Sequence, residues 1–379
     1  MKIFYKSIIL FWSILLFFSC NSVDDLSKGE DEELIYKYVK HKNNRVASLI
    51  MDDVQYNDWV KNNIFKSDVE KVMKLTKDIY KEFPDKYDFI ILLLNEYETP
   101  KSLETTSATG DGFFKPVSND INGIGCIIAQ CTNPIYSNSY LFGSSEGKLK
   151  GVLHLGNRRL IKNGPILHEL MHHWGNHALE TESVSEFGNN ISSFPTGKNN
   201  GSHWGFTGGN VNGQLGGFIQ STLKEHDDST YSVDKFQPIR HINNYHAPYN
   251  ELELYLAGMI PIDSVKDFDV FKKITSLKLK GSKFEFVSSS RTTYSTESLL
   301  DSLGKRIPDF KTSQKHFKML EIIITNKPLT EDEWEVFDKD AEWFAYKGSD
   351  ENLVENDFHK FMYNFYEATK GKGSITIGY

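Results

Sequence analysis

The sequence predicts an α+β fold with a twisted mixed sheet and a mixed C-terminal lobe, and three observations lead to this expectation. Residues 45–83 place apolar and charged side chains at helical spacing. Residues 87–94 and 317–325 are nearly continuous apolar runs of strand length, typical of strands buried on both faces. Helical and strand-like segments alternate in the C-terminal part without an internal repeat. This mixture favours an α+β chain.

The elements follow in chain order. The helix expected within residues 45–83 ends before Pro84, which cannot continue a helix. Its apolar face consists of Val69, Val72, Met73, Leu75, Ile79 and Tyr80. Residues 148–156 alternate in polarity, which predicts a half-exposed strand that could pair with an extended substrate. Residues 187–218 are rich in glycine and asparagine, so we expect a loop that surrounds something else and contributes no core. Residues 249–260 predict a further helix.

A short helix is predicted between these segments. Pro165 suits its first position because the fixed φ of proline is already helical. The helix then covers residues 166–174, and Gly175 is a natural place for it to end.

Composition and charge limit the classes of partner. The chain has 379 residues, of which 39% are hydrophobic and 25% charged, an ordinary globular balance. Its formal net charge is −8, and Lys2 and Lys6 are the only charges in the first nineteen residues, so their removal would leave −10. An acidic chain without a long basic run argues against nucleic acid or an anionic membrane surface as the main partner.

The N-terminus predicts export. Lys2 and Lys6 precede an apolar stretch over residues 7–18 that is too short to span a bilayer, which takes roughly 20 residues. The segment ends in Ser19-Cys20 and resembles a bacterial lipoprotein signal. This resemblance implies that residues 1–19 are removed and that Cys20 carries lipid, which anchors the protein at the cell surface or periplasmic face; a plainly secreted protein is the alternative.

The polar, acidic residues that follow predict a flexible tether over residues 20–45. Residues 46–379 would then form the functional domain, with two lobes, 46–180 and 181–379, left open. If Cys20 is lipidated, Cys126 and Cys131 remain as an even pair in an exported protein, which favours a disulfide. A zinc site built on them is disfavoured because a structural zinc site needs four ligands.

The predicted short helix carries chemistry. His168 and His172 are four positions apart, which places both imidazoles on one helix face, close enough to reach a single ion. Glu169 is one step round the helix, where a carboxylate can reach a water beside that ion. Two imidazoles that hold Zn²⁺ and a carboxylate that takes a proton form the arrangement of a zinc hydrolase. The alternative is an amphipathic helix with surface histidines.

Residues 150–174 resemble the zincin metallopeptidases, in which a strand precedes the zinc helix. More closely, the segments ILHELMHHWGN, SHWGF, ELELYLAGM and PDFKTSQK resemble a group of secreted bacterial zinc metalloproteases. The resemblance implies a zincin-like fold, a Zn²⁺ cofactor and a zinc-dependent endopeptidase that acts on protein or peptide substrates, with Glu169 as general base. It says nothing of oligomeric state.

Three residues compete for the third ligand position. His203 is favoured because the resembling group has a His-Trp pair here and flexible glycines surround it. His177 is an alternative, but the longer metzincin pattern fails because position 178 is alanine. Glu253 is the other alternative, either as a ligand or as the acceptor of an imidazole N–H.

Further roles are open on the same basis. Tyr255 and Tyr249 are candidates to stabilise an oxyanion, and Met259 could lie beneath the metal or be an ordinary core methionine. His173 is expected to face solvent or to surround the ligands. Two other functions compete with the endopeptidase: a non-catalytic zinc-binding surface lipoprotein, such as an adhesin or glycan-binding protein, and a metal hydrolase of non-peptide substrates. The presence of Glu169 argues against the first, because metal binding alone does not need that carboxylate.

Overall fold

The computed structural model describes residues 35–103, 112–123, 138–176, 178–183, 198–199, 202–234, 236, 246–350, 353 and 359–379. The predicted signal and lipidation site at Cys20, the predicted disulfide between Cys126 and Cys131, and the alternative ligand His177 lie outside the described residues. Within the described part, no helix is both long and apolar enough to cross a membrane.

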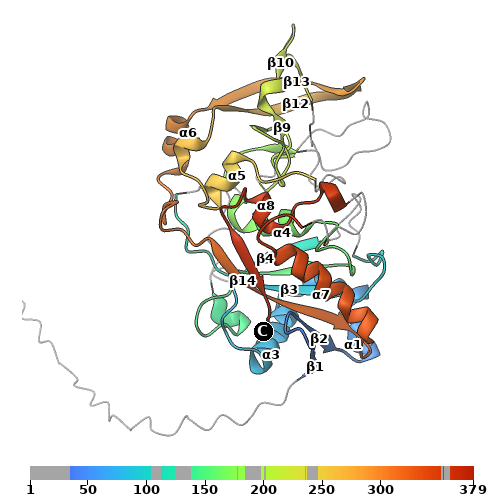
Figure 1. The fold of residues 1–379 in the computed structure, drawn as a ribbon. Coiled ribbons are helices and arrows are strands. Elements are labelled where there is room, and N and C mark those ends of the chain that lie inside the picture. Colours follow the sequence, from blue (N-terminus) through green and yellow to red (C-terminus); the bar gives the residue numbers. More distant parts are fainter. Residues whose placement is uncertain are drawn as a thin grey trace, which may run out of the picture. The chain divides into compact units, whose positions relative to one another are not determined.

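A seven-stranded mixed sheet forms the first layer of the fold (Figure 1). Its order is β1-β2-β14-β3-β5-β4, and β15 pairs with the first half of β14. Strands β2, β3 and β15 run parallel to β14, and β5 runs parallel to β3, whereas the edge strands β1 and β4 are antiparallel to their neighbours. The bounds are β1 Lys37–Lys40, β2 Val46–Ile50, β3 Phe89–Leu94, β4 Gly112–Pro116, β5 Gly151–Leu155, β14 His316–Thr325 and β15 Ser374–Ile377.

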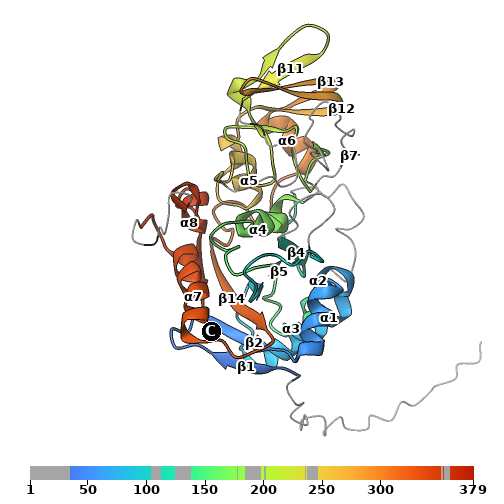
Figure 2. The ribbon, with the colours of Figure 1, turned by 90° about the vertical axis from the view of Figure 1, so that its right-hand side faces the viewer.

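Helices cover both faces of this sheet, because successive side chains of its strands point to opposite sides. In β3, Phe89, Ile91 and Leu93 belong to one core cluster, whereas the residues between them belong to the other. Helices α1 (Asp53–Lys61), α2 (Ile64–Ser67) and α3 (Val69–Glu82) complete the second cluster, and α4 (Ile166–Gly175) and α7 (Glu331–Ala345) complete the first (Figure 2).

A second sheet of four antiparallel strands has the order β10-β11-β13-β12 and a phenylalanine-rich core of its own. Helices α4 and α5 (Glu251–Leu256) lie between the two sheets (Figures 1 and 2). The strands are β10 Lys224–Glu225, β11 Thr230–Val233, β12 Phe268–Lys280 and β13 Lys283–Tyr294. The smaller elements are β6 Glu182–Ser183, β7 Lys198–Asn199, β8 Gly208–Gly209, β9 Phe218–Ile219, α6 Thr296–Leu303, α8 Phe365–Ala368 and the 3₁₀ turns Ser139–Phe142, Gln220–Thr222, Ile262–Ser264 and His359–Phe361.

The α+β class and the strongest local predictions are confirmed. Both apolar runs form strands, β3 and β14, and every residue of β3 is buried. Helix α3 ends at Glu82, just before Pro84, and buries Val72, Leu75 and Ile79. Helix α5 is shorter than the helix predicted over residues 249–260.

The predicted half-exposed strand is wrong in its exposure. Strand β5 is buried at all five positions and lies between β3 and β4, so neither of its edges can accept a substrate. The alternation that predicted exposure came from three polar residues. Lys148 and Lys150 precede the strand and are not part of it. His154 is covered by Trp59, whose indole nitrogen donates to His154 Nε2 at 3.0 Å.

The predicted tether extends too far, because residues 35–45 belong to the folded body. Strand β1 pairs with β2, and the buried Asp78 of α3 accepts hydrogen bonds from the Ile35 and Tyr36 amides and the Tyr38 hydroxyl. The two lobes left open in the sequence, 46–180 and 181–379, are not separate in the structure. Strands β14 and β15 from the second complete the sheet of β2 and β3 from the first, and residues 35–379 form one unit.

The described part of the glycine-rich segment also differs from the prediction. Trp204, Phe206, Leu215 and Phe218 are fully buried, so this loop is part of the core. Its glycines allow close backbone approach instead of marking an exposed linker.

Candidate metal centre

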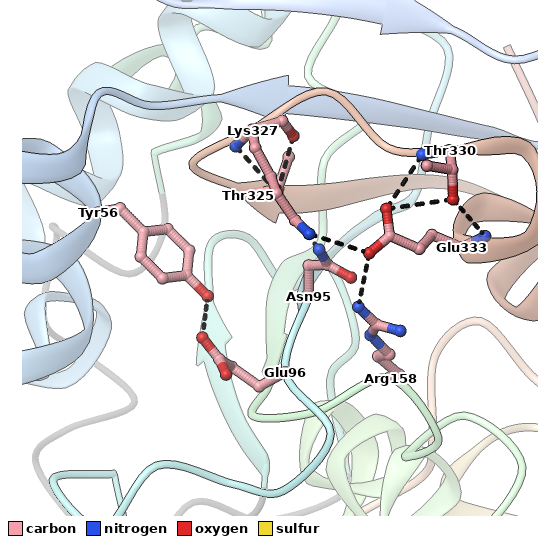
Figure 3. A network of polar contacts seen from close by, with 8 residues as sticks. All are labelled: Tyr56, Asn95, Glu96, Arg158, Thr325, Lys327, Thr330 and Glu333. Atoms are coloured by element: carbon pink, nitrogen blue, oxygen red, sulfur yellow. Dashed lines mark hydrogen bonds and ion pairs between the residues drawn. The ribbon is translucent and has the colours of Figure 1, made fainter.

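The loop between β5 and α4 is held by hydrogen bonds and ion pairs to two other segments. The loop between β5 and α4 donates the Arg158 amide to the Glu96 carbonyl oxygen at 2.9 Å. The Arg158 guanidinium lies 3.3 Å from Glu333 of α7, which also pairs with Lys327 and caps α7 through Thr330 (Figure 3). These bonds join the ends of β3, β5 and β14 and set where the helix begins.

The helix itself follows the sequence closely. Pro165 is the residue just before its first turn, and α4 spans Ile166–Gly175. Its apolar side chains pack in the main core cluster. Among its polar side chains, His168 and Glu169 are buried and His172 is half-buried. The i, i+4 spacing therefore brings the two imidazoles to one face, as predicted.

Three histidines converge on one point. His168 Nε2 lies 3.2 Å from His172 Nε2 and 3.3 Å from His203 Nε2, and the ligand atoms of all three lie within 4.8 Å of one another. A tetrahedral zinc ion with Zn–N bonds of about 2.0–2.1 Å separates its nitrogen ligands by about 3.3–3.4 Å. The two separations from His168 Nε2 fit that ion, and in the described part of the chain no other group of three candidate ligands comes together.

The contacts of the opposite ring nitrogens show which nitrogens are free of protons and could bind a cation. His168 Nδ1 lies 2.6 Å from the Gln214 carbonyl oxygen, and His172 Nδ1 lies 2.6 Å from Asn176 Oδ1. A carbonyl oxygen only accepts, so Nδ1 carries the proton and Nε2 keeps its lone pair. Lone pairs at this separation repel each other unless a cation lies between them. His203 Nδ1 has Ser202 Oγ at 3.2 Å as its partner.

The loop that orients His168 is held by Glu253. Glu253 is fully buried, and its two carboxylate oxygens accept the Leu215 amide at 2.8 Å and the Asn250 amide at 2.9 Å. Leu215 in turn accepts the Trp204 amide, next to His203, at 2.6 Å. Burial raises the pKa of the Glu253 carboxyl to about 7, against the lowering effect of the Leu215, Asn250 and Gln214 amides.

The prediction for Glu253 is therefore wrong in its detail. Glu253 is not in the group of converging ligands, and the acceptor of the His168 N–H is the Gln214 carbonyl oxygen instead. The reason is that the carboxylate oxygens of Glu253 accept hydrogen bonds from backbone amides, including that of Asn250 in the capping box of α5. It acts on the histidines only through the loop of residues 213–215.

Glu169 lies against the edge strand β4. A Cβ atom on Gly112 would come within 2.6 Å of Pro165 Cγ, 2.9 Å of Glu169 Cγ and 3.0 Å of Glu169 Oε1, so glycine allows the close approach of β4 to both residues. Among the described residues β4 pairs only with β5, which leaves its outer edge open beside Glu169. The carboxylate thus lies next to β4 and directly after His168 in α4.

The two tyrosine candidates differ in the contacts that their hydroxyl groups make. Tyr249 is fully buried and donates its hydroxyl to the Leu167 carbonyl oxygen at 2.9 Å, so it supports α4 and is not available to an oxyanion. Burial raises the pKa of Tyr255, and the Arg306 amide, its hydrogen-bond neighbour, opposes this. The catalytic role of Tyr255 stays a prediction.

His173 and Met259 are core residues. His173 is 6% exposed, and its ring meets Phe89 edge to face with centroids 5.4 Å apart, so the expectation that it faces solvent is wrong. It lies on the sheet side of α4, the side that Glu169 also occupies one turn earlier. Burial, with smaller effects of Lys150 and Arg306, lowers the pKa of His173 to about 3. Met259 is 2% exposed and packs in the main core cluster.

Sequence reasoning missed the groups that orient the imidazoles. Asn176 is four residues after His172, and this spacing could have indicated it. Gln214 acts through its backbone carbonyl oxygen, which leaves no trace in residue type. Comparison of the chain with protein-family models, with curated proteins and with solved structures found no match.

Proposed function

We propose that this protein is a zinc-dependent endopeptidase of zincin type. The observation that carries the proposal is the convergence of His168, His172 and His203 next to a buried carboxylate at β4, a strand whose outer edge has no partner among the described residues. A site for metal storage or structure would need the three imidazoles but not the last two features. Glu169 therefore favours turnover over a purely binding role.

The residues have separable tasks. Zinc held by the three imidazoles supplies Lewis acidity toward a water and toward the scissile carbonyl oxygen. Glu169 takes the proton of that water and passes it to the leaving amine, and the low solvent access of its side chain strengthens its field. The outer edge of β4, and not β5, offers backbone N–H and C=O groups to an extended peptide.

The test is Glu169→Gln, with Glu98→Gln, an exposed carboxylate, as the control with the same charge change. We expect Glu169→Gln to bind zinc like the wild type and to cleave a fluorogenic peptide library about 10²–10⁴-fold more slowly, the usual contribution of a general base. Chelation should abolish cleavage and zinc should restore it. Cleavage by Glu169→Gln at the wild-type rate, with zinc bound, would show that the carboxylate is not the base.

We also propose that Cys20 carries lipid and holds the enzyme at a membrane, on the basis of the N-terminal sequence alone. Cys20→Ala should move the protein from the membrane fraction to the soluble fraction of the producing cells. Retention of Cys20→Ala in the membrane fraction would contradict the anchor.

A further inference from the structure

We propose a second ligand site, a pocket for a small oxyanion beneath the C-terminal half of α4, which does not depend on the proposed peptidase activity. The pocket has a volume of about 180 Å³. It lies where α4, the residues that follow β4, the residue before β5 and the segment after α6 meet. Its lining residues include His173, Trp174, Lys150 and Arg306.

Arg306 is a buried cation without a carboxylate partner. It is 4% exposed, and among the described residues no carboxylate oxygen lies within 4.0 Å of it. Its hydrogen bonds go to uncharged acceptors: Nε donates to the Leu256 carbonyl oxygen at 2.9 Å, and Nη1 donates to the Pro308 carbonyl oxygen and to Ser313 Oγ. The Asp120 and Asp309 carboxylates act on Arg306 only from beyond 4.0 Å. A buried guanidinium without a carboxylate in contact is costly, and an anion in the adjoining pocket would offset that cost.

Lys150 adds a second positive charge. Its side chain is 17% exposed, and its nearest carboxylate oxygen, Asp120 Oδ1, lies 4.0 Å away on a side chain that is 77% exposed. Such a pair, at the outer limit of contact and open to solvent, neutralises little of the charge. The pocket wall therefore has two cations against one largely hydrated carboxylate.

Two further donors line the pocket from α4. His173 and Trp174 are 6% and 3% exposed and border the cavity. Within the described residues, the ring nitrogens of His173 and Trp174 make no hydrogen bond, and they are not among the enclosed nitrogens that lack a partner, so they keep access to solvent. Donors that keep solvent access at a common cavity are available to an acceptor that binds there.

The chemistry selects the class of ligand. Donors and cations that meet in one cavity fit an oxyanion, either a carboxylate or a phosphate, as a free solute or as part of a larger molecule. The cavity is smaller than the roughly 300–1,000 Å³ of pockets that enclose drug-sized ligands, so only a small anionic group would be enclosed. The competing explanation is that Arg306 only ties the end of α5 to residues 308–313, which requires no anion.

The experiment titrates the full chain with inorganic phosphate and, separately, with acetate, at an ionic strength held constant with sodium chloride. Binding is measured by calorimetry and by the shift of the unfolding temperature, with zinc added and after chelation. We expect saturable binding of at least one anion that is the same in both metal states, which separates the pocket from the histidine group. Preference for phosphate or for acetate identifies the source of the ligand.

Lys150→Gln is the decisive variant, because Lys150 is partly exposed and the protein should fold without it. We expect this change to weaken binding about tenfold, the usual loss for one charged hydrogen bond. Lys148→Gln, an exposed lysine two positions away, changes the net charge equally and should leave binding unchanged. No saturable binding of either anion, or equal weakening by the two variants, would overturn the proposal.

Discussion

Replacement of Glu253 by glutamine tests whether a residue with no contact to the metal sets its affinity. The carboxylate holds the loop of residues 213–215, and this loop supplies the Gln214 carbonyl oxygen to His168 and the Leu215 carbonyl oxygen to the Trp204 amide. Glutamine keeps the size of the side chain but replaces one of the two accepting oxygens by an amide nitrogen. One backbone N–H then faces another donor in a fully buried place.

The magnitude follows from these bonds. Loss of one hydrogen bond to a charged group in the interior costs about 1.5–3 kcal/mol. We therefore expect the free energy of unfolding of the metal-free protein to fall by about that amount. Groups that orient metal-bound imidazoles typically change metal affinity by about 10–100-fold, and we expect a loss in that range.

The assay is competition for zinc with a chromophoric chelator at pH 8, together with urea unfolding. At this pH, above the Glu253 pKa of about 7, the wild-type carboxylate is charged and accepts on both oxygens. At pH 6 it carries a proton, so the ratio of wild-type to variant affinity should shrink.

The matched control is Glu251→Gln, two positions earlier in α5. Glu251 is buried and accepts the Asn210 amide on both oxygens, but Asn210 has no contact with the histidines in the described structure. It should lose stability and keep its zinc affinity. Wild-type zinc affinity in folded Glu253→Gln, or an equal loss in Glu251→Gln, would refute the reasoning.

Three further changes test other parts of the structure. Burial and the nearby Asp340 raise the pKa of the Glu321 carboxyl well above its ordinary value. In the unfolded chain this carboxyl loses its proton near its ordinary pKa of about 4.3, whereas in the folded protein it stays protonated at higher pH. The free energy of unfolding of the wild type should therefore fall as the pH rises above about 4.3. Glu321→Gln should be more stable than the wild type at pH 8 but not at pH 4, as measured by urea unfolding. Gly112→Ala places a methyl group against Glu169 and should lower peptide cleavage about 10²-fold, with zinc content unchanged by elemental analysis. Asp78→Ala leaves two backbone amides and a hydroxyl without their acceptor and should cost about 2–3 kcal/mol in urea unfolding, with faster amide exchange in residues 35–38.

Each of these has an outcome that contradicts it. A pH profile of Glu321→Gln parallel to that of the wild type would mean that Glu321 is ionised in the fold. Loss of zinc by Gly112→Ala would place β4 in support of the ligands instead of the base. Unchanged exchange in residues 35–38 of Asp78→Ala would show that β1 is held by its pairing with β2 alone.

Local pattern was enough to predict much of the fold and the first part of the site. An unbroken apolar run predicts a buried strand, as in β3, and apolar residues at helical spacing predict an amphipathic helix, as in α3. The pairing of His168 and His172 follows from helix geometry once the helix is recognised. The proline and glycine that flank α4 gave its bounds to within a residue.

Contacts between distant segments could not be predicted in the same way. The exposure of β5 depended on Trp59, and the end of the tether depended on Asp78, each far away in the chain. His203 was favoured as third ligand by resemblance, but only the fold carried it to within 3.3 Å of His168.

The sequence by itself determined the chemistry on α4, because the residues that define it are one helical turn apart and their geometry is local. Only the tertiary structure decided what orients that chemistry: the Gln214 carbonyl oxygen on His168, Glu253 beneath its loop, and Gly112 against Glu169. These contacts use backbone atoms, or the absence of a side chain, in segments that meet only after the sheet and its helices have packed. A backbone carbonyl is the same in every residue, so its role depends on position in the fold and not on residue type.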